Sequence, residues 1–258
     1  MRSLQQFWTT RRIGEDRVTL TRLGPLRLWL ARAEREWAYA CHYGEGRDLM
    51  DLTQVPEDVV PDAMTWTTIG FGDAPRDYLF EGEIPHRPVS VKFNGPVGIP
   101  AGEEIRVFVA IPVFVRIRAL SGSLSHNLGK VASDNLYRSW FGDPASGQLC
   151  HAARESVAFD PEDLELSPNS ILCPISIRND SPGSLLLNRL CLRMRKAGLY
   201  SGATHLWSST ARILYQGQNK DCQFRILEEM PAGEDNLQCL ATPRESVISL
   251  HPRELICS

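Results

Sequence analysis

Branched hydrophobic residues alternate with other residue types over residues 105–118. They occupy every second position, at Ile105, Val107, Val109, Ile111, Val113, Val115 and Ile117. Because successive side chains on a strand point to opposite faces, this period of two predicts a strand with one buried face. The segment is longer than most strands, and Pro112 cannot donate a ladder hydrogen bond. We therefore expect a bend, a bulge or an edge position at Pro112.

Shorter alternating segments, separated by Gly, Pro, Asn and Asp, continue along the chain. Segments 18–20 and 26–30 flank a Gly-Pro turn, and residues 26–43 predict a hairpin with its loop within 31–35. The leucines of 184–195 fit either a helix or a strand, and the turns on both sides favour the strand. Further strands are expected at 64–69, 76–80, 89–93, 171–178, 210–215, 222–227 and 246–250. Residues 44–62 and the connector from Pro96 to Gly102 are expected to be loops.

This pattern predicts an all-β protein with little helix. About a dozen short, mostly antiparallel strands with regular turns are typical of β-sandwiches and barrels. The apolar alternation fades between Ser121 and Lys130, which places a division there. We expect two packed, sandwich-like halves, 1–120 and 121–258.

The composition is that of a globular protein without a membrane-spanning segment. Of its 258 residues 43% are hydrophobic, but the longest apolar run, 107–115, is far shorter than the ~20 residues of a membrane helix. The N-terminus lacks the apolar core of a secretion signal. Seven scattered cysteines without Cys-x-x-Cys spacing suit a reducing cytoplasm. A net charge of −3 gives no general attraction to nucleic acid or anionic membranes.

The sequence gives only weak evidence for a metal site. Thiolates and imidazoles bind zinc, and two Cys-His dipeptides occur, Cys41-His42 and Cys150-His151. Adjacent strand residues point to opposite faces, however, so one ion could not easily take both members of a pair. We expect no metal and no cofactor.

Nucleophilic catalysis would need Ser156 with His151 and Asp160, or Cys150 with His151. The sequence has no Gly-x-Ser-x-Gly turn and no family-specific cysteine signature. Nearness along the chain does not supply the required geometry, so we expect no enzyme activity. The acidic run 160–165 is read as a solvated turn.

Arginines interleaved with phenylalanines on the even-numbered side of 105–118 form a candidate basic face. Its arginines are Arg106, Arg116 and Arg118, and a second basic group comprises Arg189, Arg193, Arg195 and Lys196. Such faces can bind nucleic acid. Most are solvated or paired with acids, so no nucleic acid is expected.

The strongest candidate site is the turn between two strands at 140–151. Two large aromatic residues beside a turn are costly to expose, so they either plug the core or contact a partner. Sealing the core is the commoner role of Trp and Phe near strand ends. The candidate binding residues are Trp140, Phe141, Gly142, Asp143, Gly147, Cys150 and His151.

Three stretches of the chain resemble a known family. They are the 107–117 strand with Pro112, the Trp-Phe-Gly-Asp motif at 140–143 with Gly147 and Cys150, and Ile-Ser-Ile-Arg-Asn at 175–179. Together they resemble domain of unknown function 432, over most of the chain from about residue 37. The resemblance implies no established activity or catalytic residue. Members sometimes lie in the genome beside mechanosensitive channels, which implies at most a membrane-channel partner.

We therefore expect a non-catalytic interaction or regulatory module that presents an edge strand or a loop surface to another protein. The family resemblance points to a membrane channel as one such partner, and association of the chain with itself is a further option. The alternative is a sandwich or barrel that binds a small ligand in a cavity, with the Trp140 turn near its mouth.

Overall fold

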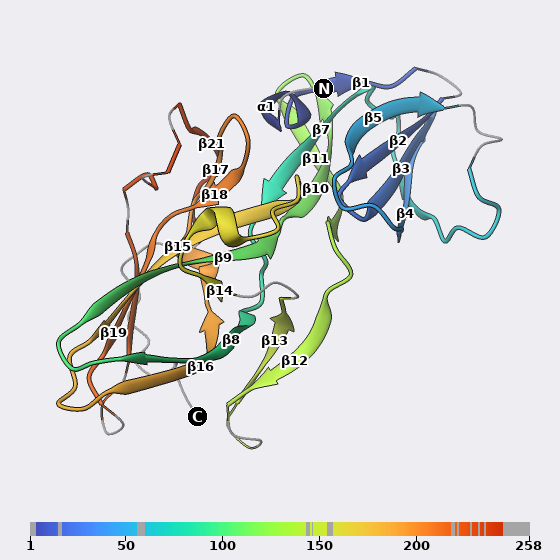
Figure 1. The fold of residues 1–258 in the computed structure, drawn as a ribbon. Helices are drawn as coiled ribbons and strands as arrows, with labels where there is room; N and C mark the ends of the chain where they lie inside the picture. Colours follow the sequence, from blue (N-terminus) through green and yellow to red (C-terminus); the bar gives the residue numbers. More distant parts are fainter. Residues whose placement is uncertain are drawn as a thin grey trace. The chain divides into compact units, whose positions relative to one another are not determined.

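The computed structural model describes residues 4–14, 17–55, 60–142, 145, 147–153, 157–217, 220, 222–227, 229–231, 233–234 and 236–244. The protein is mostly β, in four mostly antiparallel sheets (Figure 1), as the alternation predicts. Over these residues no sheet closes on itself. The helices are short, at α1 (Leu4–Phe7), η2 (Pro161–Asp163) and η3 (Met194–Lys196). In the described ranges, no helix has the length and apolar character that crossing a bilayer requires.

The chain forms two compact units, each built from separate segments. Unit 1 contains the residues up to Glu83, Val113–Asn135 and Ser167–Asn169, and unit 2 contains Ile84–Pro112, Leu136–Leu166 and the residues from Ser170. The long alternating segment changes units at Val113, between β9 (Glu104–Pro112) and β10 (Phe114–Ser121). The expected interruption at Pro112 is confirmed, because the first strand ends there. The division into halves 1–120 and 121–258 stays a prediction.

Unit 1 contains two sheets. One has the order β1-β7-β10-β11, with β1 (Arg11–Arg12), β7 (Asp77–Glu83) and β11 (Leu124–Ala132) beside β10. The other has the order β5-β2-β3-β4-β6, from β5 (Met50–Val55), β2 (Val18–Leu23), β3 (Leu26–Ala33), β4 (Glu36–Tyr43) and β6 (Thr67–Gly70). The hairpin predicted over 26–43 is β3–β4, so that prediction is confirmed.

Aromatic side chains join the two sheets of unit 1. Trp37 on β4 is fully buried, its ring centre lies 5.9 Å from that of Tyr78 on β7, and its indole nitrogen donates to the Pro75 carbonyl at 2.9 Å. Phe7 of α1 stacks on Phe80, the ring centres 6.0 Å apart. These contacts contribute to the core of unit 1, because Trp, Tyr and Phe each bury a large apolar area.

One expectation for unit 1 is wrong, and one strand was not predicted. Residues 44–62 are not a single loop, because β5 lies within them and pairs with β2. The sequence indicated no strand where the apolar alternation fades, and the structure has β11 there, from Leu124, paired with β10. Both are edge strands of their sheets, and most of their residues are exposed or half-buried. Main-chain pairing holds such strands without the buried side chains that would mark them in the sequence.

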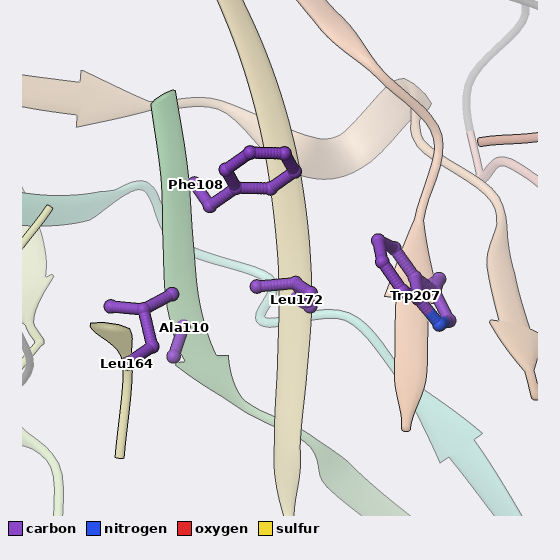
Figure 2. Close-up of a cluster of buried hydrophobic side chains, with 5 residues drawn as sticks. All are labelled: Phe108, Ala110, Leu164, Leu172 and Trp207. Carbon is purple, nitrogen blue, oxygen red and sulfur yellow. The ribbon is translucent and has the colours of Figure 1, made fainter. Parts of the chain in front are cut away.

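The larger sheet of unit 2 has the order β14-β9-β15-β18-β17-β21, with β19 beside β15 and β20 beside β19. Its strands other than β9 are β14 (Val157–Ala158), β15 (Ser170–Asn179), β17 (Leu199–Ser201), β18 (Leu206–Ser208), β19 (Ala211–Tyr215), β20 (Gln223–Ile226) and β21 (Gln238–Ala241). From Val107 to Pro112, strand β9 is buried on both faces. Figure 2 shows Phe108 and Ala110, from its even-numbered side, clustered with Leu164, Leu172 and Trp207.

The second sheet of unit 2 has the order β12-β13-β8-β16. Its strands are β12 (Tyr137–Phe141), β13 (Gln148–Ala152), β8 (Val89–Ile99) and β16 (Leu185–Leu192). The strand interpretation of 184–195 is confirmed by β16. The connector expected from Pro96 is wrong in its first part, because β8 continues to Ile99 and pairs there with Leu185. The strand expected at 246–250 lies outside the described residues.

Candidate functional site

The turn predicted at 140–151 joins β12 and β13 in an antiparallel hairpin, in register from Tyr137 opposite Ala152 to Phe141 opposite Gln148. Gly142 follows β12 with φ of 94°, a conformation that favours glycine. A Cβ on Gly142 would lie 3.2 Å from the Gly147 Cα. Both glycines of the motif therefore serve the tight return of the chain. Asp143 lies outside the described residues.

The two aromatic residues of the predicted site differ in exposure, because Trp140 is exposed and Phe141 is half-buried. Trp140 and Leu149 lie opposite each other and are 47% and 38% exposed, while Tyr137 at the base of β12 is 57% exposed. Trp140 therefore forms part of the surface and Phe141 is partly covered, and the choice between the two roles considered for these aromatics stays a prediction.

Arg189 of β16 holds the hairpin against the rest of its sheet. Its Nε donates to Ser90 Oγ at 2.5 Å, and its Nη2 donates to Ser139 Oγ on β12 at 2.7 Å. The guanidinium carbon lies 5.1 Å from the centre of the Phe141 ring, in cation–π geometry. Sequence reasoning placed Arg189 only in a basic group. Its partners, 99 and 50 residues away in the chain, carry no local signal of this contact.

Two buried thiols add a second link between the hairpin and β16. The sulfur atoms of Cys150 and Cys191 lie 3.6 Å apart, and Gln148 Nε2 donates to Cys191 Sγ at 3.2 Å. Burial, with Cys150 beside it, raises the pKa of Cys191 to about 12. Cys191 is therefore a neutral thiol at pH 7, and such thiols behave as small hydrophobic groups.

His151 lies at the base of the hairpin, next to Cys150 along the strand and hence on the other face. It is buried, and its ring centre lies 5.6 Å from that of His86. Burial foremost, then the nearby charges of His86, Arg87 and Arg138, lower the pKa of His151 to about 4. His151 is therefore neutral at pH 7 and has two arginines close by.

We expect the protein to lose stability through His151 as the pH falls from about 6.5 towards 4. The unfolded chain takes up the imidazole proton at its ordinary pKa, whereas the folded chain binds it only near pH 4, so acid favours unfolding. The expected loss between pH 7 and pH 5 is about 1 kcal/mol after allowance for solvent screening. Urea unfolding at both pH values measures it. His151→Leu should reduce this difference and the exposed control His126→Leu should not, and equal pH dependence in both variants would contradict the assignment.

The basic face predicted from the central segment does not form. Arg106 lies on β9 in unit 2, whereas Arg116 and Arg118 lie on β10 in unit 1, because the chain changes sheets at Val113. Arg116 pairs with the buried carboxylate of Glu83. Arg118 lies 3.9 Å from Glu81 and donates to Ser125 Oγ at 2.7 Å. The prediction of one shared face is wrong.

The sheet that carries the hairpin and the segments next to its strands are rich in basic residues, which lie on both faces of the sheet. The described segments 84–99, 137–142, 147–153 and 185–201 contain no Asp or Glu. Their basic residues are Arg87, Lys92, Arg138, Arg189, Arg193, Arg195 and Lys196. Sequence reasoning found only the last four together, because Arg87, Lys92 and Arg138 join them through pairing of strands that are distant in the chain.

Comparison with known protein families identifies the family of this chain. No curated protein and no solved structure matches this chain. A family model described as "Protein of unknown function (DUF432)" matches residues 7–254, and thus includes the N-terminal strands that the resemblance noted from the motifs left out. The match covers nearly the whole chain, so the protein belongs to the DUF432 family.

Proposed function

We propose that the protein is a non-catalytic binding module that presents the β12–β13 hairpin to another protein. The observation that carries this proposal is the cross-strand pair of Trp140 and Leu149, 47% and 38% exposed on a hairpin at the end of its sheet. Tryptophan is the residue type most often found to dominate binding energy at protein interfaces. Burying this pair against a partner would remove apolar surface from water.

The contacts beneath the hairpin support the proposal, because they hold the exposed pair in place before binding. Arg189 fixes β12 through Ser139 and Phe141, and Cys191 contacts Gln148 and Cys150 on β13. A rigid surface loses little conformational entropy when a partner binds. Cys150 and Cys191, which form no disulfide although their sulfur atoms lie 3.6 Å apart, also suit a reducing compartment such as the cytoplasm, which the proposal includes. On the family resemblance alone, a mechanosensitive channel is the first partner to test.

Affinity capture tests the proposal with three forms of the purified protein. They are the wild type, the double variant Trp140→Ser with Leu149→Ser, and the control Leu186→Ser, which changes a 59% exposed leucine on β16, the other end strand of the same sheet. Extracts of cytoplasm and of membranes are passed over each form, and retained proteins are identified by mass spectrometry. We expect a protein retained by the wild type and the control and lost by the double variant. The same retained proteins on all three forms would contradict the proposal.

A further inference from the structure

Two arginines at the base of the hairpin have no acidic partner among the described residues. Arg138 is exposed on β12 and Arg87 is half-buried just before β8, and neither makes an ion pair within the described part of the chain. Arg138 lies opposite His151 on the paired strands, and the His151 backbone N–H donates to the carbonyl of Pro88, the residue after Arg87, at 2.8 Å. His151 itself is neutral at pH 7, so it adds no charge to that of the arginines.

Arg138 and Trp140 are two residues apart on one strand, so their side chains lie on the same face. Leu149 is opposite Trp140 and lies on that face as well. The surface therefore presents an apolar pair and a cation at the spacing of alternate residues in an extended chain. A ligand chain running along β12 has the same spacing of about 7 Å between alternate residues.

We propose that the hairpin binds an acidic extended protein segment in which an apolar residue and an Asp or Glu stand two positions apart. This inference rests on the proposed function and specifies its partner. The apolar residue covers Trp140 and Leu149, and the carboxylate pairs with Arg138, with Arg87 extending the basic region. Arginine binds carboxylates in a two-pronged geometry that favours such a partner.

Charge argues against two other occupants of this surface. A second copy of the chain would bring Arg138 and Arg87 of both copies together, because the described residues of these segments include no Asp or Glu to pair with them, and like charges repel. Nucleic acid would be attracted by the sheet but repelled by the chain as a whole, whose net charge is −3. A short acidic segment would contact only the region around Arg138 and Arg87 and not the rest of the negatively charged chain.

Selection from a library of random ten-residue peptides displayed on phage tests the inference without a known partner. On the wild-type protein we expect enrichment of peptides with an apolar residue two positions from Asp or Glu. On Arg138→Glu the enriched charge should change to Lys or Arg. The control Arg225→Glu, which reverses an exposed arginine on β20 in the other sheet of the unit, should leave the selection as in the wild type.

The best peptide is then synthesised, and its binding is measured by fluorescence anisotropy. Replacing its acid by the amide should weaken binding to the wild-type protein up to about fivefold, the effect of one exposed ion pair with Arg138. This comparison needs no protein variant, so it holds even where Arg138→Glu fails to fold. Tighter binding of a twenty-residue oligo-dT than of the peptide at 150 mM salt would overturn the inference in favour of nucleic acid.

The outcomes separate this inference from the proposed function. Peptides that need Trp140 but show no acidic enrichment overturn the acidic segment and leave the hairpin as the binding surface. Peptides that bind equally well to the Trp140→Ser, Leu149→Ser variant overturn both. Acidic enrichment that is lost with Trp140 and reversed with Arg138 supports both.

Discussion

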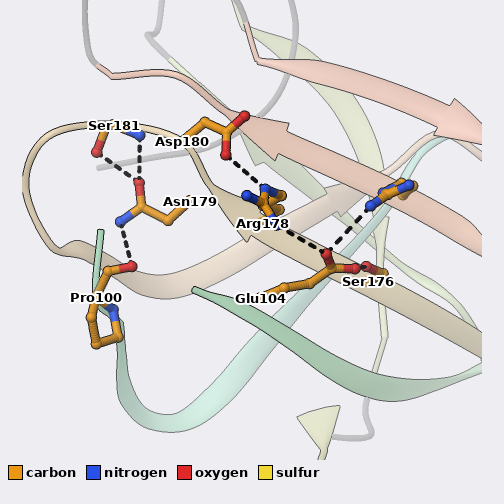
Figure 3. Close-up of polar contacts among 8 residues, drawn as sticks. Pro100, Glu104, Ser176, Arg178, Asn179, Asp180 and Ser181 are labelled. Atoms are coloured by element: carbon orange, nitrogen blue, oxygen red, sulfur yellow. Dashed lines mark hydrogen bonds and ion pairs between the residues drawn. The ribbon is translucent and has the colours of Figure 1, made fainter. Parts of the chain in front are cut away.

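Replacing Asn179 by aspartate is expected to lower the free energy of unfolding by about 4 kcal/mol at pH 7, because the new carboxylate would face three carbonyl oxygens in the protein interior. Asn179 is fully buried at the end of β15, and Figure 3 shows its side chain between the chain turns at Pro100 and Ser181. Its Nδ2 donates to the carbonyls of Ile99, Pro100 and Gly183 at 2.8, 3.2 and 2.8 Å. Aspartate has no amide hydrogen and cannot make these bonds.

The acceptor half of the same side chain explains why the effect will depend on pH. Asn179 Oδ1 accepts from the backbone N–H and the hydroxyl of Ser181, at 3.0 and 2.7 Å, and a carboxylate can keep these two bonds. The surrounding carbonyls disfavour its charge, so its pKa in the folded protein should lie above the ordinary value. The folded state then binds more protons than the unfolded state, and the variant should regain stability as the pH falls from 7 towards 5.

Urea unfolding of wild type and variant at pH 7 and pH 5 measures both effects. Asn188→Asp is the matched control, since Asn188 is exposed on β16, the strand that follows. It should change stability by no more than about 0.5 kcal/mol. A cost at Asn179 as small as the control's would show that the Asn179 hydrogen bonds contribute little to the fold.

Replacing Glu83 by glutamine is expected to cost about 3 kcal/mol, because it removes a buried anion that two cations share. Glu83 ends β7 with 9% of its surface exposed. It pairs with Arg116 of β10, and Lys130 Nζ of β11 lies 3.4 Å from its Oε2. Arg116 and Lys130 lie opposite each other, so without Glu83 two like charges would face each other across paired strands.

Glu81→Gln provides a control on the same strand. The Glu81 carboxylate lies 3.9 Å from Arg118 and is more exposed than that of Glu83, and exposed pairs contribute about 0–1 kcal/mol. Thermal and urea unfolding of both variants should show a clear loss only for Glu83→Gln. Salt gives a further test, because 0.5 M NaCl should reduce the effect at Glu81 more than that at buried Glu83. Equal losses in both variants would contradict the role assigned to Glu83.

Much of the fold could be predicted where strands bury one face and end in strong turns. The β3–β4 hairpin and the strand β16 have buried alternating residues bounded by Gly, Pro, Asn or Asp, and the turn between β12 and β13 is marked by its Gly, Asp and Pro residues. Prediction failed where a strand is paired mainly through its backbone. Strands β5 and β11 and the second half of β8 have exposed, polar or Gly-Pro residues, which resemble those of loops.

The sequence predicted where the candidate site lies but not which residues of other strands contribute to it. The Trp-Phe-Gly motif marks the hairpin, because its turn residues and aromatics are adjacent in the sequence. The partners of the hairpin come from β8 and β16, and nothing near Ser90 or Arg189 in the chain indicates that they meet Ser139. The same limit explains the error over Arg106 and Arg116. Alternation shows which side chains share a face only while the strand stays in one sheet, and this chain changes sheets at Val113.

The segmented make-up of unit 1 affects the order in which the protein can fold as it is synthesised. Its last segment includes Asn169, whose carbonyl accepts from the Val113 N–H and whose amide donates to Ser133 Oγ. A ribosome adding about 5–20 residues per second needs roughly 4–17 s to extend the chain from Glu83 to Asn169. The strands made first, with their apolar faces, must wait through that interval for their remaining partners. Chaperone protection of the nascent chain is therefore most needed before residue 169 emerges.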